Sequence, residues 1–213
     1  MTIFLDNVIP TPMLEENLEA SEVWNKQLSI DSKKRYFLSS NSGKGKSTFL
    51  NFIVGLRNDY KGTLTIDGKT ANLISLKDWA KIRSTKIAYL PQDLQLINHL
   101  TVWENLILKN NLTNHYTSTE IESFLAQFSL STFKDRKINT LSIGQQQRVA
   151  LIRTVLQPLD LLLLDEPFSH LDEENIKICL NLIDSVCKKE AAGFIIATLG
   201  YNYGVNSIET LLL

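Results

Sequence analysis

Apolar runs alternate with helical patterns along much of the chain, and this order predicts an α/β fold. Short apolar runs typical of strands lie at 35–39, 87–90, 161–165 and 193–198. The last two are unbroken over most of their length, which is typical of a parallel sheet covered on both faces. Apolar residues recur at helical spacing in 46–56 and again in 176–187. Strand, helix and strand in this order indicate a βαβ crossover.

Two further regions have a different pattern. Residues 62–67 alternate and end at Asp67-Gly68, a pair typical of turns, so we expect an antiparallel hairpin strand there. Helical spacing dominates 102–133, where Thr117 and Glu120 form a capping-box pattern, so we expect a helical insertion. A short strand is expected at 207–213. Because no repeat or linker separates these regions, we expect one domain over 1–213, with a helical subdomain at about 93–157.

Composition places the chain among ordinary globular proteins. Its 213 residues suit one large domain or two small ones. The formal net charge is −1, which argues against a dedicated nucleic-acid binder. The longest apolar runs are far shorter than the roughly 20 residues that cross a bilayer, and the first ten residues lack the basic start of a secretory signal. Any role at a membrane is therefore expected to come through a partner.

The two cysteines are expected to be reduced and packed. Cys179 and Cys187 lie in one helical pattern, separated by about 12 Å along the helix axis. That distance is too long for a disulfide between them. His99 and His115 have no metal-binding partners nearby in sequence, and we expect both to be polar surface residues.

A Gly- and Ser-rich segment follows the first of the listed strands and opens the helix at 46–56. Backbone N–H groups at such a helix N-terminus can cradle a phosphate. Lys46 is placed to reach β- and γ-phosphate oxygens, and the Ser47 hydroxyl to coordinate Mg²⁺. The alternative is a Gly/Ser-rich turn with a basic surface. The expected nucleotide-binding residues here are Asn41, Ser42, Gly43, Lys44, Gly45, Lys46, Ser47 and Thr48.

Ser40 stands where the phosphate-loop pattern G-x-x-x-x-G-K-[ST] has its first glycine. A left-handed backbone at this position would make Ser about 1–2 kcal/mol less favourable than Gly. An extended backbone would remove that cost.

Two carboxylates, Asp165 and Glu166, come directly after the apolar run 161–164. They are expected at the carboxyl edge of the sheet, where open α/β folds bind ligands. Asp165 suits the Mg²⁺ shell, and Glu166 suits the polarisation of an attacking water. Such a pair by itself also fits a polar exit from a strand. Its presence with a phosphate loop in one chain favours a nucleotide-hydrolysing site.

The order of the motifs resembles one family. Residues 141–148 read Leu-Ser-Ile-Gly-Gln-Gln-Gln-Arg, a segment called the signature below, and stand shortly before the acidic strand. Gln92 follows the strand at 87–90, and residues 169–172 read Ser-His-Leu-Asp. Over about residues 23–213 the chain is similar to the ATPase subunit of an ATP-binding cassette (ABC) transporter.

The resemblance implies a fold and a set of site residues. The fold is a P-loop NTPase core with a parallel sheet, an antiparallel β subdomain and an inserted α-helical subdomain. ATP and Mg²⁺ are the implied cofactors, with Glu166 and Gln92 as catalytic residues. The implied metal ligands are Ser47, Gln92 and Asp165. The signature residues Ser142, Gly144 and Gln145 would bind the γ-phosphate of ATP held by a second copy, although Ser142 and Gln145 also fit a simple capping box.

The resemblance also implies partners. These are a second ABC ATPase subunit, as a homodimer or a heterodimer, and an integral membrane permease, but no nucleic acid. The expected location is cytoplasmic, at the inner face of the cell membrane through the permease. Residues 96–106 are similar to the segment that receives a coupling helix of the permease, but Leu100 and Trp103 suit a core equally well. The chain would be a minimal cassette.

The sequence departs from the family at several positions. Leu199 stands where the family has a histidine that contacts the γ-phosphate, and Ile143 replaces the first of two glycines. His170 is the nearest remaining histidine, and a packing role in its loop is the favoured interpretation. No aromatic residue for adenine can be placed, because Phe4 and Trp24 both lie at unsuitable distances from the phosphate loop in sequence.

Two hypotheses for function follow. The leading one is an ATPase subunit that couples dimer closure and ATP hydrolysis to a separate permease, supported by Lys46, Asp165 and Glu166. The alternative is a hydrolysis-impaired partner that acts as a regulatory or structural half of a heterodimer, supported by Ser40, Ile143 and Leu199. A DNA-associated cassette is disfavoured because the chain lacks long coiled-coil arms.

Overall fold

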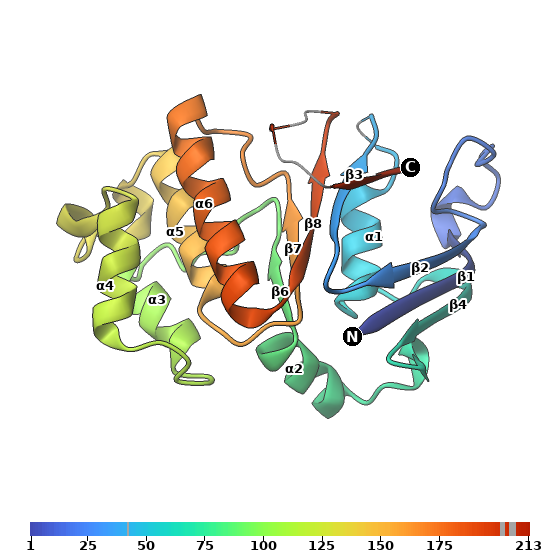
Figure 1. Cartoon of the computed structure of the whole chain (residues 1–213), viewed down its shortest axis with the longest axis horizontal. Coiled ribbons are helices and arrows are strands. Elements are labelled where there is room, and N and C mark those ends of the chain that lie inside the picture. The colour runs from blue at the N-terminus through green and yellow to red at the C-terminus, as the bar shows by residue number, and fades with distance from the viewer. Residues whose placement is uncertain (42, 201–202, 205–207) are drawn as a thin grey trace.

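The computed structural model describes residues 1–41, 43–200, 203–204 and 208–213 (Figure 1). Ser42 of the predicted phosphate loop and Ser207 of the predicted final strand lie outside the described residues. The strands are β1 (Thr2–Pro10), β2 (Gln27–Asp31), β3 (Arg35–Ser39), β4 (Tyr60–Ile66), β5 (Lys69–Thr70), β6 (Ile87–Leu90), β7 (Leu161–Asp165), β8 (Gly193–Thr198) and β9 (Glu209–Leu212). The α-helices are α1 (Lys46–Ile53), α2 (Leu76–Thr85), α3 (Val102–Asn110), α4 (Ser118–Gln127), α5 (Ile143–Val155) and α6 (Glu173–Glu190).

The strands form two sheets. The first has the order β6-β7-β8-β3-β9, and its strands pair in parallel. The second has the order β2-β1-β4-β5 and is antiparallel. The hairpin of β4 and β5 turns at Asp67-Gly68, as the sequence predicts. The parallel core with a separate antiparallel sheet confirms the predicted fold class.

The parallel sheet is buried on both faces because alternate side chains of a strand point to opposite sides. In β7, Leu161 and Leu163 pack in one core with α1 and the antiparallel sheet. Leu162 and Leu164 pack in a second core with helices α3 to α6. Figure 1 shows α1 on one side of β7 and β8, with α5 and α6 on the other. The unbroken apolar run in this strand therefore reflects two cores that share one sheet.

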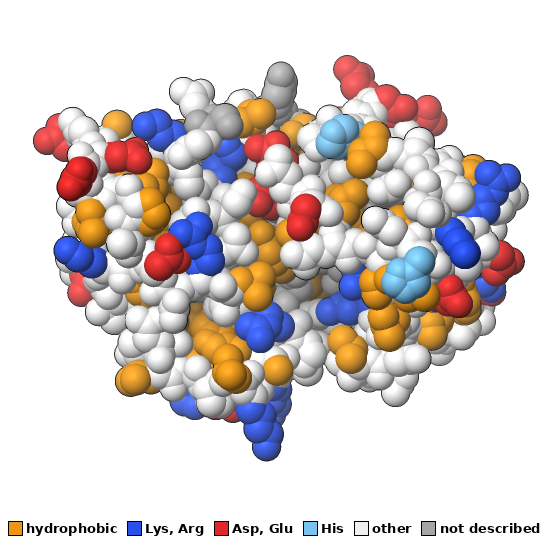
Figure 2. Space-filling view, turned by 180° about the vertical axis from the view of Figure 1, so that it is seen from behind, with side chains coloured by type: hydrophobic (Ala, Val, Ile, Leu, Met, Phe, Trp, Pro, Cys, Tyr) orange, Lys and Arg blue, Asp and Glu red, His pale blue; other side chains and the backbone are white. Residues whose placement is uncertain are grey.

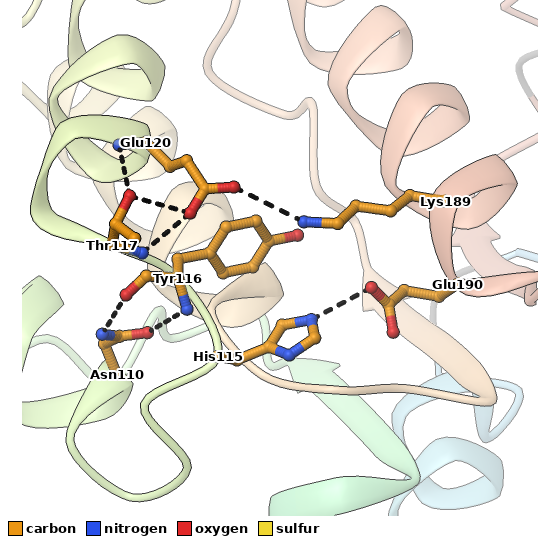
Figure 3. Close-up of polar contacts among 7 residues, drawn as sticks. All are labelled: Asn110, His115, Tyr116, Thr117, Glu120, Lys189 and Glu190. Atoms are coloured by element: carbon orange, nitrogen blue, oxygen red, sulfur yellow. Dashed lines mark hydrogen bonds and ion pairs between the residues drawn. The ribbon is translucent and has the colours of Figure 1, made fainter.

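The helical insertion is confirmed, and α3, α4 and α5 each begin with a capping box. The turn after α3 is fastened to the end of α6 (Figure 3). His115 Nε2 lies 3.0 Å from Glu190 Oε1, and Lys189 Nζ lies 4.2 Å from the centre of the Tyr116 ring. His115 is half-buried in this contact, so it lies only partly at the surface. The sequence pattern does not reveal this contact because Glu190 lies 75 positions from His115 in sequence.

Four elements differ from the sequence-based expectations. Strands β1 and β2 and helix α2 were not predicted, although β1 alternates buried and exposed side chains over much of its length. Helix α1 ends at Ile53 instead of continuing to residue 56. Gly55 has a φ of 67°, and a Cβ at this position would overlap the ring of Trp79. The left-handed backbone at Gly55 therefore ends the turn that follows the helix.

Among the described residues, no helix is both long enough and apolar enough to cross a membrane. Cys179 and Cys187 are buried free thiols, as expected, and burial raises the pKa of each to about 12. The face seen in Figure 2 is hollowed near its middle, where hydrophobic and basic side chains gather.

Candidate functional site

The phosphate-loop segment connects β3 to α1 and leaves the start of the helix open. Gly43 and Gly45 have φ values of 82° and 91°, a left-handed backbone that favours glycine. Gly45 is the N-cap of α1 and provides no side-chain cap, so N–H groups of the first turn remain available to a ligand. Ser40 does not have a positive φ, so it carries none of the backbone cost considered for a left-handed residue.

Lys46 is the buried cation of this segment, with 6% of its surface exposed. Its Nζ donates to the carbonyl oxygens of Ser40 at 2.9 Å and Asn41 at 3.2 Å. The same Nζ lies 4.0 Å from Glu166 Oε1. The Lys46 charge therefore lies between the loop and the acidic strand end, where an anion would exchange carbonyl partners for stronger charge-assisted ones.

Asp165 ends β7 and is buried, with its Oδ1 lacking any hydrogen-bond partner among the described residues. Burial raises the pKa of Asp165, with the Ser47 hydroxyl opposing this shift and the charge of Glu166 adding to it. An unpartnered buried carboxylate oxygen beside a serine hydroxyl is a fitting donor pair for a hard cation such as Mg²⁺.

Glu166 follows with a left-handed backbone, φ 48°, and its N–H donates to the Ala197 carbonyl oxygen at 3.1 Å. A left-handed backbone at a non-glycine residue costs about 1–2 kcal/mol. This hydrogen bond to the end of β8 holds the residue where its carboxylate reaches Lys46. Such strain is often found at functional sites.

The parallel register brings two more predicted positions to the same edge. Leu90 of β6 pairs with Leu164, and Asp165 pairs with Ala197 of β8. Gln92, just beyond β6, and Leu199, just beyond β8, therefore leave the sheet at the edge that carries Asp165. Both are exposed in the structure.

The other loop residues are placed as follows. Asn41 and Lys44 are exposed, and the Thr48 hydroxyl accepts a hydrogen bond from Arg57 at 3.2 Å. Lys44 Nζ lies 3.9 Å from Glu16 Oε2, a solvent-exposed pair.

The signature begins α5 with a closed capping box. The Ser142 N–H donates to Gln145 Oε1 at 2.9 Å, and the Gln145 N–H donates to Ser142 Oγ at 3.3 Å. A Cβ at Gly144 would lie 3.0 Å from the His170 carbonyl oxygen, so the loop of residues 169–172 packs directly on this helix turn. The Gln147 side chain donates to the Pro167 carbonyl oxygen at 2.7 Å. The signature is thus fastened to the loop that follows Glu166.

The signature and the phosphate loop do not meet within one chain. Helix α1 packs in the core on one face of the parallel sheet and α5 in the core on the other. No hydrogen bond or ion pair joins residues 142–145 to the described part of 41–48. Any phosphate bound to both would have to lie between two chains.

Trp24 lies against the phosphate loop, which corrects its sequence-based placement. Its Nε1 donates to the Lys44 carbonyl oxygen at 3.3 Å, and a Cβ at Gly45 would lie 3.2 Å from its ring. The ring is buried and makes edge contacts with Phe49 and Phe52. Trp24 therefore supports the loop from inside the core. The contact between Trp24 and Lys44 joins residues 20 positions apart, so no local pattern predicts it. The apolar character of Trp24 was the one signal in the sequence, and it indicated only burial.

His170 is exposed, and its Nδ1 lies 3.0 Å from the Ser169 hydroxyl. Its contact with Gly144 is made by the backbone carbonyl oxygen. Trp103 is half-buried against the helical core, with Lys134 Nζ 3.9 Å from the centre of its ring, while His99 is exposed as expected.

Comparisons with known proteins agree with this arrangement. A family model described as ABC transporter matches residues 23–169. The thiamine import ATP-binding protein ThiQ of Histophilus somni is 30% identical over 188 residues, covering 87% of this chain and 85% of ThiQ. The lipoprotein-releasing system ATP-binding protein LolD of Buchnera aphidicola is 31% identical over 160 residues, covering 74% of this chain and 70% of LolD. A dimeric structure of the ATP-binding cassette MJ0796 bound to ADP and Pi matches with a TM-score of 0.80 and 27% identity, covering 98% of this chain and 94% of that chain.

Proposed function

The chain belongs to the ABC transporter family, and from that premise we propose that Lys46, Asp165 and Glu166 bind and hydrolyse ATP in this ATPase subunit. The observation that carries the proposal is the contact of the buried Lys46 ammonium with Glu166, beside the unpartnered oxygen of Asp165. The comparisons favour a hydrolysing subunit over the hydrolysis-impaired partner of a heterodimer.

The triphosphate would be held by the loop and by α1. Lys46 would exchange its carbonyl partners for β- and γ-phosphate oxygens, and N–H groups of the first turn of α1 would donate to the β-phosphate. The proposed nucleotide-binding residues of this segment are Asn41, Ser42, Gly43, Lys44, Gly45, Lys46, Ser47 and Thr48.

Mg²⁺ fits the donor set at the carboxyl edge. Ser47 and Asp165 would hold it, and Gln92 would join them from the end of β6. The unpartnered Oδ1 of Asp165 supports this assignment. When bound, the ion would neutralise phosphate charge.

Glu166 is the proposed general base. A water oxygen attacks the γ-phosphorus, its proton moves toward the Glu166 carboxylate, and the bond from the γ-phosphorus to the bridging oxygen of ADP breaks. Lys46 and the loop N–H groups stabilise the charge that grows on the leaving oxygen. Gln92 would orient the water.

A second ABC ATPase subunit is proposed to complete the site. The signature residues Ser142, Gly144 and Gln145 lie across the sheet from their own phosphate loop, so they would contact ATP held by a partner subunit in a head-to-tail pair. The dimeric state of the MJ0796 cassette supports such a pair.

We propose that residues 1–213 form one ABC ATPase domain, with an approximate helical subdomain at 93–157 that would face an integral membrane permease. ThiQ and LolD are named for import and for lipoprotein release, respectively. This subunit would accordingly work at the cytoplasmic face of the membrane through its permease.

Glu166→Gln tests the proposal because it keeps the shape of the side chain but removes the base. We expect kcat for Mg²⁺-ATP hydrolysis to fall about 10²–10⁴-fold, while ATP binding by calorimetry is retained. We also expect Mg²⁺-ATP to hold this variant as a dimer in size-exclusion chromatography with light scattering. An unchanged kcat would refute the role of Glu166, and a monomer at saturating Mg²⁺-ATP would refute self-pairing.

A further inference from the structure

Side-chain donors hold carbonyl oxygens of the phosphate-loop segment in two different ways. Lys46 Nζ donates to those of Ser40 and Asn41. The Lys44 carbonyl oxygen instead accepts a hydrogen bond from the indole nitrogen Nε1 of Trp24 at 3.3 Å. Lys46 would exchange its carbonyl partners for phosphate oxygens, whereas the indole lies in the core and has no such exchange to make. The Trp24 hydrogen bond is therefore compatible with a nucleotide-bound loop.

This hydrogen bond fixes the direction of a backbone N–H group. A trans peptide places the carbonyl oxygen of one residue and the N–H of the next on opposite sides of the bond, and the described residues contain no cis peptide. Because Trp24 draws the Lys44 carbonyl oxygen toward the core, the Gly45 N–H is directed away from it. No described residue accepts a hydrogen bond from that N–H. The Gly45 carbonyl oxygen accepts from the Phe49 N–H at 2.8 Å, so the Lys46 N–H is directed out of the helix start.

The indole also lies directly behind the turn at Gly45. A Cβ on this residue would lie 3.2 Å from Trp24 Cζ2 and 3.4 Å from Met13 Sδ. The φ of 91° at Gly45 is one that other residues rarely adopt. The turn therefore cannot relax toward the core without displacing a large buried ring.

Trp24 is itself held at both ends. Its ring is 1% exposed and makes edge contacts with Phe49 and Phe52, at centroid distances of 5.8 and 6.1 Å. Its backbone N–H and that of Val23 donate to the buried Ser21 Oγ at 2.8 and 3.1 Å. The indole N–H thus comes from a rigid support, which is the condition for holding the loop in one conformation.

We propose that Trp24 is a positioning residue for the diphosphate part of the nucleotide. By holding the Lys44 carbonyl oxygen, it makes the Gly45 and Lys46 N–H groups face the β-phosphate before the nucleotide binds. The inference rests on the proposed function for the identity of the ligand. Successive backbone N–H groups at a turn form an anion-binding concavity. A loop that is already ordered binds more tightly because binding does not have to order it. ADP and ATP should benefit equally, since both carry the β-phosphate.

Trp24→Phe tests the proposal because it removes the indole N–H and keeps a buried ring. We expect the Kd values of Mg²⁺-ADP and Mg²⁺-ATP, measured by calorimetry on the full chain, to rise by the same factor of about threefold to tenfold, the contribution of one hydrogen bond. KM for ATP should rise with them and kcat should fall less, the pattern of lost ground-state binding. The matched control is Phe52→Leu, on the other side of the same aromatic contact. It should lower stability toward denaturant without changing either Kd.

A second measurement uses the natural chain and does not depend on the folding of Trp24→Phe. Coupling between two sites is reciprocal, so bound Mg²⁺-ADP should slow hydrogen exchange of the Trp24 indole N–H by at least about tenfold in ¹H–¹⁵N spectra. The chain has three tryptophans, and Trp79→Phe and Trp103→Phe assign the other two indole signals. The indole of Trp79, which lies against Gly55, should exchange at the same rate with and without ADP.

The possible results separate this inference from the proposed function. Equal weakening in Trp24→Phe and Phe52→Leu, a loss for ATP without one for ADP, or unchanged exchange of the Trp24 indole would overturn the positioning role. Natural affinity for both nucleotides in Trp24→Phe would also overturn it, while ATP binding and hydrolysis by the natural chain would leave the proposed function standing. A natural chain that binds neither nucleotide would overturn the proposed function and, with it, the role assigned to Trp24.

Discussion

Helices α1 and α5 both begin at a proposed phosphate contact, but their first turns are built differently. α1 starts at Gly45 with a left-handed backbone and no side-chain cap. α5 starts at Ser142, which closes a capping box with Gln145. A capping box occupies two N–H groups that an uncapped turn leaves free. We infer that α1 can take a phosphate by itself, whereas α5 adds contacts to a phosphate that another subunit already holds.

A large effect is expected at Leu199, just beyond β8, whose side chain offers no hydrogen-bond donor to a γ-phosphate. A donor aimed at developing charge commonly contributes about 10²–10³ in rate. We therefore expect slow turnover in the natural chain and a rise of about tenfold to 10²-fold in kcat for Leu199→His. His170→Ala, on an exposed side chain, is expected to have no effect. A brisk natural rate that neither change alters would contradict this account.

A smaller effect distinguishes the role of Ser142 as the N-cap of α5 from its proposed role in the dimer. Ser142→Ala removes the cap and should lower the free energy of unfolding by about 0.5–2 kcal/mol. Thr117→Ala, which removes the equivalent capping box of α4, is the matched control and should cost a similar amount. Only Ser142→Ala should also reduce ATP hydrolysis. Equal hydrolysis in both variants, measured at a temperature where both are folded, would leave Ser142 with a structural role alone.

The smallest effect concerns the ammonium group of Lys109, whose pKa is lowered by burial. Lys109 has a pKa of about 8 in the folded chain, below its ordinary 10.5. Between these values the unfolded chain binds more protons, so this group makes the folded state more stable as the pH rises from 8 to 10.5. Lys109→Met should therefore stabilise the protein most at pH 7, and the gain should shrink toward pH 10.5. Denaturant unfolding at several pH values measures it, and a gain that is independent of pH would contradict the lowered pKa.

The sequence predicts the parallel core well because its strands are apolar on both faces. Residues 161–165 are strand β7 as predicted, and Asp165 with Glu166 is found at its carboxyl end beside Lys46. Strand β1 is different. Its pairing joins Ile3 to Ile66, which no local pattern reveals. The short, interrupted alternation at the N-terminus carries too little signal without that partner strand.

Prediction of the site from the sequence is limited in the same way, because some of its contacts join distant segments. The phosphate-loop pattern identifies Lys46. The pattern does not reveal that Trp24, which lies between β1 and β2, supports the loop through a hydrogen bond to the Lys44 carbonyl oxygen. The absence of a positive φ at Ser40 is likewise decided by the fold and not by the residue type. Residue types thus indicate the chemistry, whereas contacts between distant segments are seen only in the structure.

The most direct test of the central claim is ATP affinity, measured by calorimetry, for Lys46→Ala and Ser142→Ala. If the phosphate is held at α1, Lys46→Ala should lose about 2–5 kcal/mol of binding free energy. Lys44→Ala, which removes an exposed lysine of the same loop, should lose less than about 1 kcal/mol. Ser142→Ala should bind ATP as the natural monomer does. Unchanged affinity in Lys46→Ala, or an equal loss in Lys46→Ala and Ser142→Ala, would contradict the account.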